Sequence, residues 1–87
     1  MQISLNEIRK KIDQLINEDL SRETIAEWAK KRQEIEDEDQ LEYDPPYEEK
    51  RIWRAITYLM GVDLKDMDGS YLHSIANFID FRKKNDL

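Results

Sequence analysis

The sequence predicts an all-α protein, a compact bundle of about four short helices. Aliphatic residues recur at the three- and four-residue spacing that places them on one face of a helix. Only 2 glycines and 2 prolines interrupt the 87 residues, and many of the others lose little side-chain freedom in a helix. We expect a single helical domain over residues 1–87, because a chain of this length supports one hydrophobic core.

Serine caps divide the first half of the chain into two predicted helices. Ser4 stands three residues before Glu7, which is the spacing of a capping box. We therefore expect a helix that begins after Ser4 and ends near Asn17. Ser21 is a second N-cap residue, and the apolar side chains after it repeat with helical period. A second helix is expected over residues 22–35.

Two further helices are predicted in the second half. Residues 46–60 combine a proline start with inward-facing apolar side chains, and Gly61 follows in the position of a left-handed helix stop. Ser74 caps a final helix that ends in the basic run 82–84. Cations are favoured there because the C-terminal end of a helix carries partial negative charge.

An acidic segment separates the second predicted helix from the third. Residues 34–49 contain nine acidic side chains and no lysine or arginine. We expect an acidic connector at about 36–45, because like charges repel and two consecutive prolines cannot continue a helix. Carboxylates beside tyrosines suit the lysines and arginines of a basic partner, although such segments also serve only to solubilise a protein. The predicted partner-binding residues are Glu36, Asp37, Glu38, Asp39, Glu42, Tyr43, Asp44 and Tyr47.

The composition argues against catalysis and against a bound cofactor. Without cysteine the chain has no disulfide and no thiolate metal site. His73 is the one histidine, and no nucleophile–base arrangement, phosphate-binding loop or metal-ligand cluster accompanies it. The Asp66–Gly69 segment reads as a turn, because a calcium loop counted on Gly69 would lack both terminal oxygen ligands. We predict a protein that is not an enzyme and that needs no cofactor or metal.

Charge and hydropathy limit the partners and the location. A formal net charge of -6 repels nucleic acid and anionic lipid. The basic trios 9–11, 30–32 and 82–84 lack interleaved aromatic residues, so we expect no nucleic-acid partner. No apolar run approaches the ~18 residues of a membrane span, and no secretory signal is visible, so we expect no membrane contact and a cytoplasmic location. The sequence defines no oligomeric state.

Several strings resemble a family of bacterial inhibitors. They are SRETIAEWA at 21–29, Trp53, LMGVDL at 59–64 and YLHS at 71–74. In these positions the chain resembles small all-helical immunity proteins of polymorphic-toxin and contact-dependent inhibition systems. The resemblance implies a cytoplasmic protein without activity of its own that binds and neutralises a cognate toxin domain, often a nuclease.

Resemblance and charge together lead to one functional prediction and one alternative. The prediction is an immunity protein whose acidic surface binds a basic toxin domain and blocks it. The alternative is a non-catalytic interaction or regulatory module that binds its partner through an apolar groove. Salt separates the two, because exposed charge attractions weaken as ionic strength rises.

Overall fold

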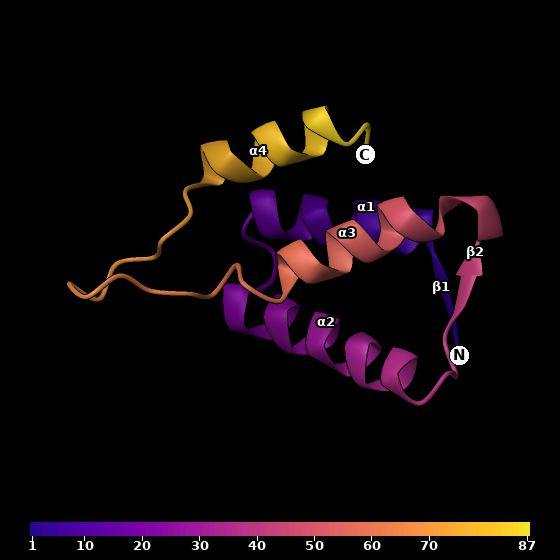
Figure 1. The fold of residues 1–87 in the computed structure, drawn as a ribbon. Coiled ribbons are helices and arrows are strands. Elements are labelled where there is room, and N and C mark those ends of the chain that lie inside the picture. Colours follow the sequence, from indigo (N-terminus) through magenta and orange to yellow (C-terminus); the bar gives the residue numbers. More distant parts are fainter.

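Four α-helices and a two-stranded parallel sheet make up the computed structural model, which describes residues 1–87 (Figure 1). The elements follow the order β1 (Gln2–Ser4), α1 (Leu5–Ile16), α2 (Arg22–Asp37), β2 (Glu42–Asp44), the 3₁₀ helix η1 (Pro46–Glu48), α3 (Glu49–Leu59) and α4 (Ile75–Lys84). The predicted helical bundle is confirmed as a mostly helical fold. The prediction of an all-α class is wrong in detail, because it leaves out the sheet.

The predicted serine caps begin three of the helices. The Ser4 hydroxyl accepts a hydrogen bond from the backbone N–H of Glu7 at 3.0 Å, and Ser21 caps α2 in the same way. At the start of α4, the Ser74 hydroxyl accepts from the Asn77 N–H at 3.2 Å, and the Asn77 side chain accepts from the Ser74 N–H at 2.8 Å. These bonds satisfy N–H groups that have no partner within the helix.

Acidic residues, and not glycine, occupy the left-handed position after three helices. Glu18, Asp39 and Asp86 follow α1, α2 and α4 with φ values of 60°, 59° and 54°. After α4, the N–H of Leu87 donates to the carbonyl of Arg82 at 2.9 Å, which is the Schellman pattern. The prediction for Gly61 is wrong, because the glycine with positive φ is Gly69 at 87°.

The sheet occupies part of the predicted connector. β1 and β2 pair in parallel, with Gln2 opposite Glu42 and Ile3 opposite Tyr43. Ile3 is completely buried, so its side chain anchors β1 to the core. α2 continues to Asp37, so the part of the segment outside helix and strand is residues 38–41 and Pro45. The acidic run is therefore shared between a helix end, a strand and the 3₁₀ helix.

The core lies between the helices and beneath the sheet. α1 and α3 are central, with α2 on one side and α4 on the other (Figure 1). Only one residue of α4, Phe78, is fully buried, whereas α3 buries four. The buried residues are Ile3, Leu5, Ile8, Ile12, Leu15, Ile25, Ala26, Ala29, Leu41, Ile52, Ala55, Ile56, Leu59, Val62 and Phe78.

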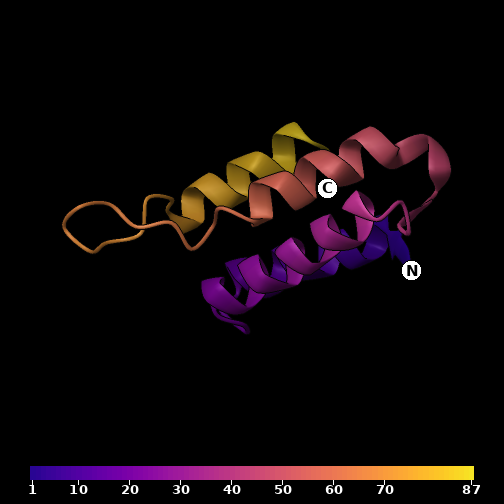
Figure 2. The same cartoon turned by 60° about the horizontal axis from the view of Figure 1, so that its bottom comes forward.

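A hairpin-like segment extends away from the helices between α3 and α4, and we call residues 63–73 the arm (Figures 1 and 2). The N–H of Leu72 donates to the carbonyl of Leu64 at 2.9 Å, and Asp66 donates to Ser70 at 2.7 Å. Leu64 is 53% exposed, and Met67 at the tip is 103% exposed. The arm is thus ordered by its own backbone and carries apolar side chains in solvent.

None of the helices is both long and apolar enough to span a lipid bilayer.

Candidate functional site

α3 and α4 are basic although the whole chain is acidic. The two helices contain Glu49 and Asp80 as their acidic residues, and their basic residues are more numerous. Those basic residues are Lys50, Arg51, Arg54, Arg82, Lys83 and Lys84. α2, by contrast, carries more acidic than basic side chains. α3 and α4 therefore carry a net positive charge within an acidic chain.

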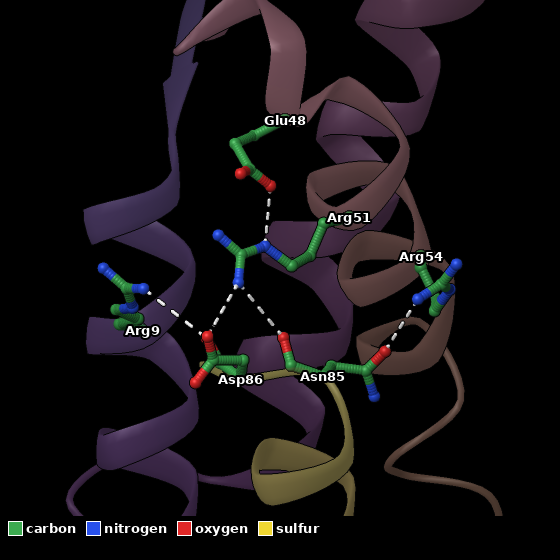
Figure 3. Close-up of polar contacts among 6 residues, drawn as sticks. All are labelled: Arg9, Glu48, Arg51, Arg54, Asn85 and Asp86. Atoms are coloured by element: carbon green, nitrogen blue, oxygen red, sulfur yellow. Dashed lines mark hydrogen bonds and ion pairs between the residues drawn. The ribbon is translucent and has the colours of Figure 1, made fainter.

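Three arginines converge on the residues that follow α4, and we call Arg9, Arg51 and Arg54 the arginine cluster (Figure 3). Arg51 of α3 donates from Nη1 to the backbone carbonyls of Asn85 at 3.4 Å and Asp86 at 2.9 Å. Arg54 donates to the Asn85 side-chain oxygen at 3.0 Å. From α1, Arg9 reaches the Asp86 carbonyl at 3.5 Å. Residues distant in sequence thus share one small group of oxygen acceptors.

The end of α4 explains this convergence. We call residues 85–87 the exit turn. Carbonyls in the last turn of a helix lack intrahelical partners and carry the negative end of the helix dipole. Guanidinium groups have five N–H donors in a planar fork, so they satisfy these oxygens well. Asp86 adds a carboxylate whose Oδ2 lies 3.8 Å from Arg51 Nη1.

Glu48 holds Arg51 from the other side. Its Oε2 accepts from Arg51 Nε at 2.7 Å, and both side chains are 22% exposed. This bond fixes the stem of Arg51 and leaves Nη1 directed toward Asn85 and Asp86, as Figure 3 shows. The guanidinium group of Arg51 is thus held in place, and one of its nitrogen atoms contacts backbone oxygens that another acceptor could replace. Such a group is suited to binding phosphate or carboxylate.

Exposed charges surround the arginine cluster. Lys83 and Lys84 are exposed in the turn of α4 directly before Asn85. Lys84 pairs with Asp80 at 2.9 Å, while Arg82 turns inward to pair with Asp13 of α1. The last turn of α4 therefore combines basic side chains that face solvent with one that holds the helix to α1.

The predicted acidic site falls on several elements. Glu36 and Asp37 end α2, Glu38 and Asp39 follow it, and the group from Glu42 to Asp44 forms β2. Tyr47 lies in η1 and is 86% exposed. The structure brings Glu42, Tyr43 and Asp44 together at one surface hollow. The hollow is completed by Gln2, Pro46 and Glu49. A partner-binding role for this acidic surface stays a prediction.

Tyr43 is the one predicted site residue with a strongly perturbed pKa. Burial raises the pKa of the Tyr43 phenol, and its hydrogen bond to Glu36 Oε2 at 3.0 Å raises it further. The phenol is therefore a neutral donor that joins β2 to the end of α2. This role is structural and requires no partner.

The structure shows no cluster of side chains suited to binding a metal ion. No three acidic, histidine or cysteine side chains are grouped so that they could hold a metal ion. The His73 ring is 5.7 Å from the ring of Tyr58, and its backbone carbonyl accepts from Arg22. His73 thus lies at the entry to α4 among packing contacts.

Sequence reasoning missed Arg51 and Arg54. The available signal was their spacing: Arg54 lies four residues after Lys50 and three after Arg51, so it neighbours both on the surface of a helix. Its importance was hidden by the nearby acidic run, and the acceptors at Asn85 and Asp86 are apparent only after α4 packs against α1 and α3.

Comparisons with known proteins point away from toxin immunity. The family model described as "YxzC DNA-binding protein" matches residues 2–85. The chain is also 32% identical over 81 residues to the "Uncharacterized protein YxzC" of Bacillus subtilis (strain 168), a match that covers 93% of this chain and 61% of the relative. The chain thus spans less than two thirds of that relative's length. No solved structure matches.

These matches contradict three predictions. The resemblance to immunity proteins was wrong, since the matched family is a different one. The predictions of a toxin partner and of no nucleic-acid partner were also wrong, because the family description names DNA binding. The prediction of no nucleic-acid partner rested on the net charge. A sum over 87 residues conceals how the charges are distributed among the helices. With nearly its whole length matched by the model, the chain belongs to the family of YxzC DNA-binding proteins.

Proposed function

We propose that this protein binds DNA and that the basic surface of α3 and α4 contacts the phosphate backbone. The observation that carries the proposal is the convergence of the arginine cluster beside exposed Lys83 and Lys84. The description of the family supports the same role. Arginine and lysine supply most contacts to DNA phosphates, and these contacts position a protein without reading sequence.

The acidic residues in the rest of the chain affect the strength of DNA binding and its dependence on salt. A net charge of -6 opposes the approach of DNA, so attraction has to come from a local basic surface. Each neutralised phosphate releases counterions, and the logarithm of the binding constant falls by about 0.9 per contact for each tenfold rise in salt. We therefore expect weak binding at physiological salt that strengthens steeply as salt is lowered.

Fluorescence anisotropy with a pool of random-sequence duplexes tests the proposal over a series of salt concentrations. The test variant is Arg54→Ala with Lys83→Ala, which removes two exposed cations from the basic surface. We expect the affinity to fall roughly tenfold or more and the salt slope to fall by about two, since two phosphate contacts are lost.

The matched control is Lys30→Ala with Lys31→Ala, two exposed lysines of α2. It changes the net charge by the same amount but leaves α3 and α4 unaltered. Its affinity should fall much less than that of the test variant. Equal losses in both variants would show dependence on net charge alone, and absence of binding by the unchanged protein at low salt would end the proposal.

A role in DNA binding also bears on reaction class and location. The family description names a binding activity and no reaction. We propose that the protein acts without catalysis and in the cytoplasm, where bacterial DNA lies.

A second candidate function, protein interaction, is favoured by the arm. Leu64, Met67 and Leu72 are 53%, 103% and 55% exposed on a backbone that its own hydrogen bonds order. Ordered apolar side chains in solvent are typical of interaction surfaces. The apolar surface that binds the partner would then be the arm, and not the groove that the alternative prediction from the sequence assumed.

Photo-crosslinking from position 67 tests this candidate in a host that expresses the protein. A specific adduct that disappears with Leu64→Ser and Leu72→Ser, while Lys30→Ser leaves it unchanged, would support the candidate. An adduct insensitive to both arm substitutions, or none at all, would contradict it.

A further inference from the structure

We propose that the exit turn of α4 occupies a phosphate-binding site formed by the arginine cluster, so that DNA binds there by displacing it. The proposal rests on the proposed DNA-binding function and specifies how its central site is regulated. It concerns the oxygen atoms of Asn85 and Asp86 and the guanidinium groups that they engage (Figure 3).

The oxygen atoms at the site imitate a phosphate group. Two carbonyl oxygens and one amide oxygen, all from Asn85 and Asp86, accept bonds of 2.9 to 3.5 Å from Arg9, Arg51 and Arg54. A phosphate also presents several oxygens within a small volume and carries formal charge. It therefore forms stronger bonds with guanidinium groups than neutral oxygens do.

The site is prepared before phosphate arrives. Arg51 is held at Nε by Glu48 and is largely covered, so its Nη1 needs little reorganisation to exchange one acceptor for another. Arg9 approaches from α1 and Arg54 from α3, on either side of the exit turn (Figure 3). Binding to groups already in place loses less conformational entropy than binding to mobile side chains.

The exit turn is suited to being displaced. Asp86 is fully exposed and holds a left-handed conformation, φ 54°, that side chains rarely adopt. α4 itself buries only Phe78. The bonds within the turn run from the Asp86 N–H to Lys83 at 3.3 Å and from the Leu87 N–H to Arg82 at 2.9 Å. Without the arginines on its carbonyls, Asp86 retains its single backbone bond, while Asn85 keeps its two bonds to the Phe81 carbonyl and Leu87 keeps its partial packing against the core.

Asp86→Asn tests the contribution of the competing carboxylate. It removes the charge near Arg51 and keeps a residue that tolerates the left-handed conformation. We expect DNA affinity to rise roughly three- to tenfold, since a negative competitor is lost beside the site. Asp39→Asn is the control, because it makes the same substitution at φ 59° after α2, away from the arginine cluster. Its affinity should change by less than about twofold, the effect of net charge at a distance.

Amide hydrogen exchange by NMR tests displacement directly, with tripolyphosphate and then duplex DNA as probes. The Asp86 and Leu87 amides should exchange at least about tenfold faster with either probe bound, because their turn has lost its arginine contacts. The Glu18 and Asp19 amides form the equivalent turn after α1, with bonds of 3.3 and 2.9 Å, and should not change.

The two proposals fail in different ways. DNA binding with unchanged exchange at the exit turn, and with equal effects of Asp86→Asn and Asp39→Asn, would overturn displacement while leaving DNA binding intact. Accelerated exchange with tripolyphosphate in a protein that does not bind DNA would support the phosphate site and refute the DNA-binding function. Unchanged exchange with both probes would overturn the site itself.

Discussion

Tyr58 of α3 lies face to face with Phe81 of α4, with ring centroids 3.8 Å apart and ring planes 3° apart. Four residues further along the chain, directly after α4, Asn85 meets the arginine cluster. The stack and the arginines thus hold the same face of α4 at two successive turns. Phe78, the buried residue of α4, meets the Tyr58 ring edge-on with centroids 6.3 Å apart.

The stack predicts an energetic coupling between α3 and α4. In a double-mutant cycle of Tyr58→Ala and Phe81→Ala, we expect a coupling free energy of about 0.5–1.5 kcal/mol from urea unfolding, the range for aromatic pairs. Phe81→Leu, which keeps apolar volume but not the ring, should lose most of the coupling. Strict additivity of the single variants would contradict a direct interaction.

The bond from Tyr43 to Glu36 predicts a pH-dependent link between β2 and α2. Tyr43→Phe should lower the free energy of unfolding by about 1 kcal/mol at neutral pH, the value of a typical hydrogen bond. The folded pKa of Tyr43 lies above its ordinary value of 10. Its contribution is therefore complete below pH 10 and is lost as pH rises through the folded pKa. Unfolding measured from pH 8 upward should show the wild type and Tyr43→Phe converging, and parallel curves would refute the link.

Acidic residues in left-handed conformations predict stabilising substitutions. Glu18→Gly and Asp39→Gly should each raise the free energy of unfolding by up to about 1 kcal/mol, because glycine adopts φ near +60° without the side-chain clash. Thermal unfolding would detect the gain. Gln33→Gly, inside α2, is the opposite control and should destabilise the protein by about 1 kcal/mol.

The bond from Tyr71 to Glu23 predicts acid-sensitive attachment of the arm. The Tyr71 hydroxyl donates to Glu23 Oε1 at 2.6 Å, and this bond lowers the pKa of Glu23 from 4.5. The attachment is therefore present above pH 4.5 and is lost as pH falls through the lowered pKa. NMR shifts of the Tyr71 ring should change in that acidic range, and Glu23→Gln should remove the change. A midpoint at or above the ordinary value would contradict the prediction.

Local patterns were sufficient to predict most helices. The Ser4, Ser21 and Ser74 caps gave three helix starts, since a hydroxyl needs only an N–H three residues away. Helix ends were harder, because an acidic residue in a left-handed conformation carries no signal like that of glycine. The sheet was missed because its strands contain three residues each and pair across the chain.

The candidate site depends on tertiary structure and was therefore not predictable in the same way. Arg9, Arg51 and Arg54 have no local motif in common, and their acceptors are backbone atoms that every residue possesses. Tyr43 was predicted to bind a partner, which stays a prediction, and in the structure its hydroxyl donates to Glu36 of the same chain. A carboxylate of the acidic segment can accept the hydrogen bond of a tyrosine in the same segment, without any partner protein.

The parallel sheet also affects how the chain folds. Gln2 lies opposite Glu42, so the pairing closes a loop that contains all of α1 and α2. Closing a loop of this size costs roughly 3 kcal/mol of chain entropy. The hydrogen bonds of three residue pairs offset only a small part of that cost. The strands can therefore pair only after α1 and α2 have packed and brought their ends together. Their formation should be a late folding event, so substitutions at Ile3 should accelerate unfolding far more than they slow folding.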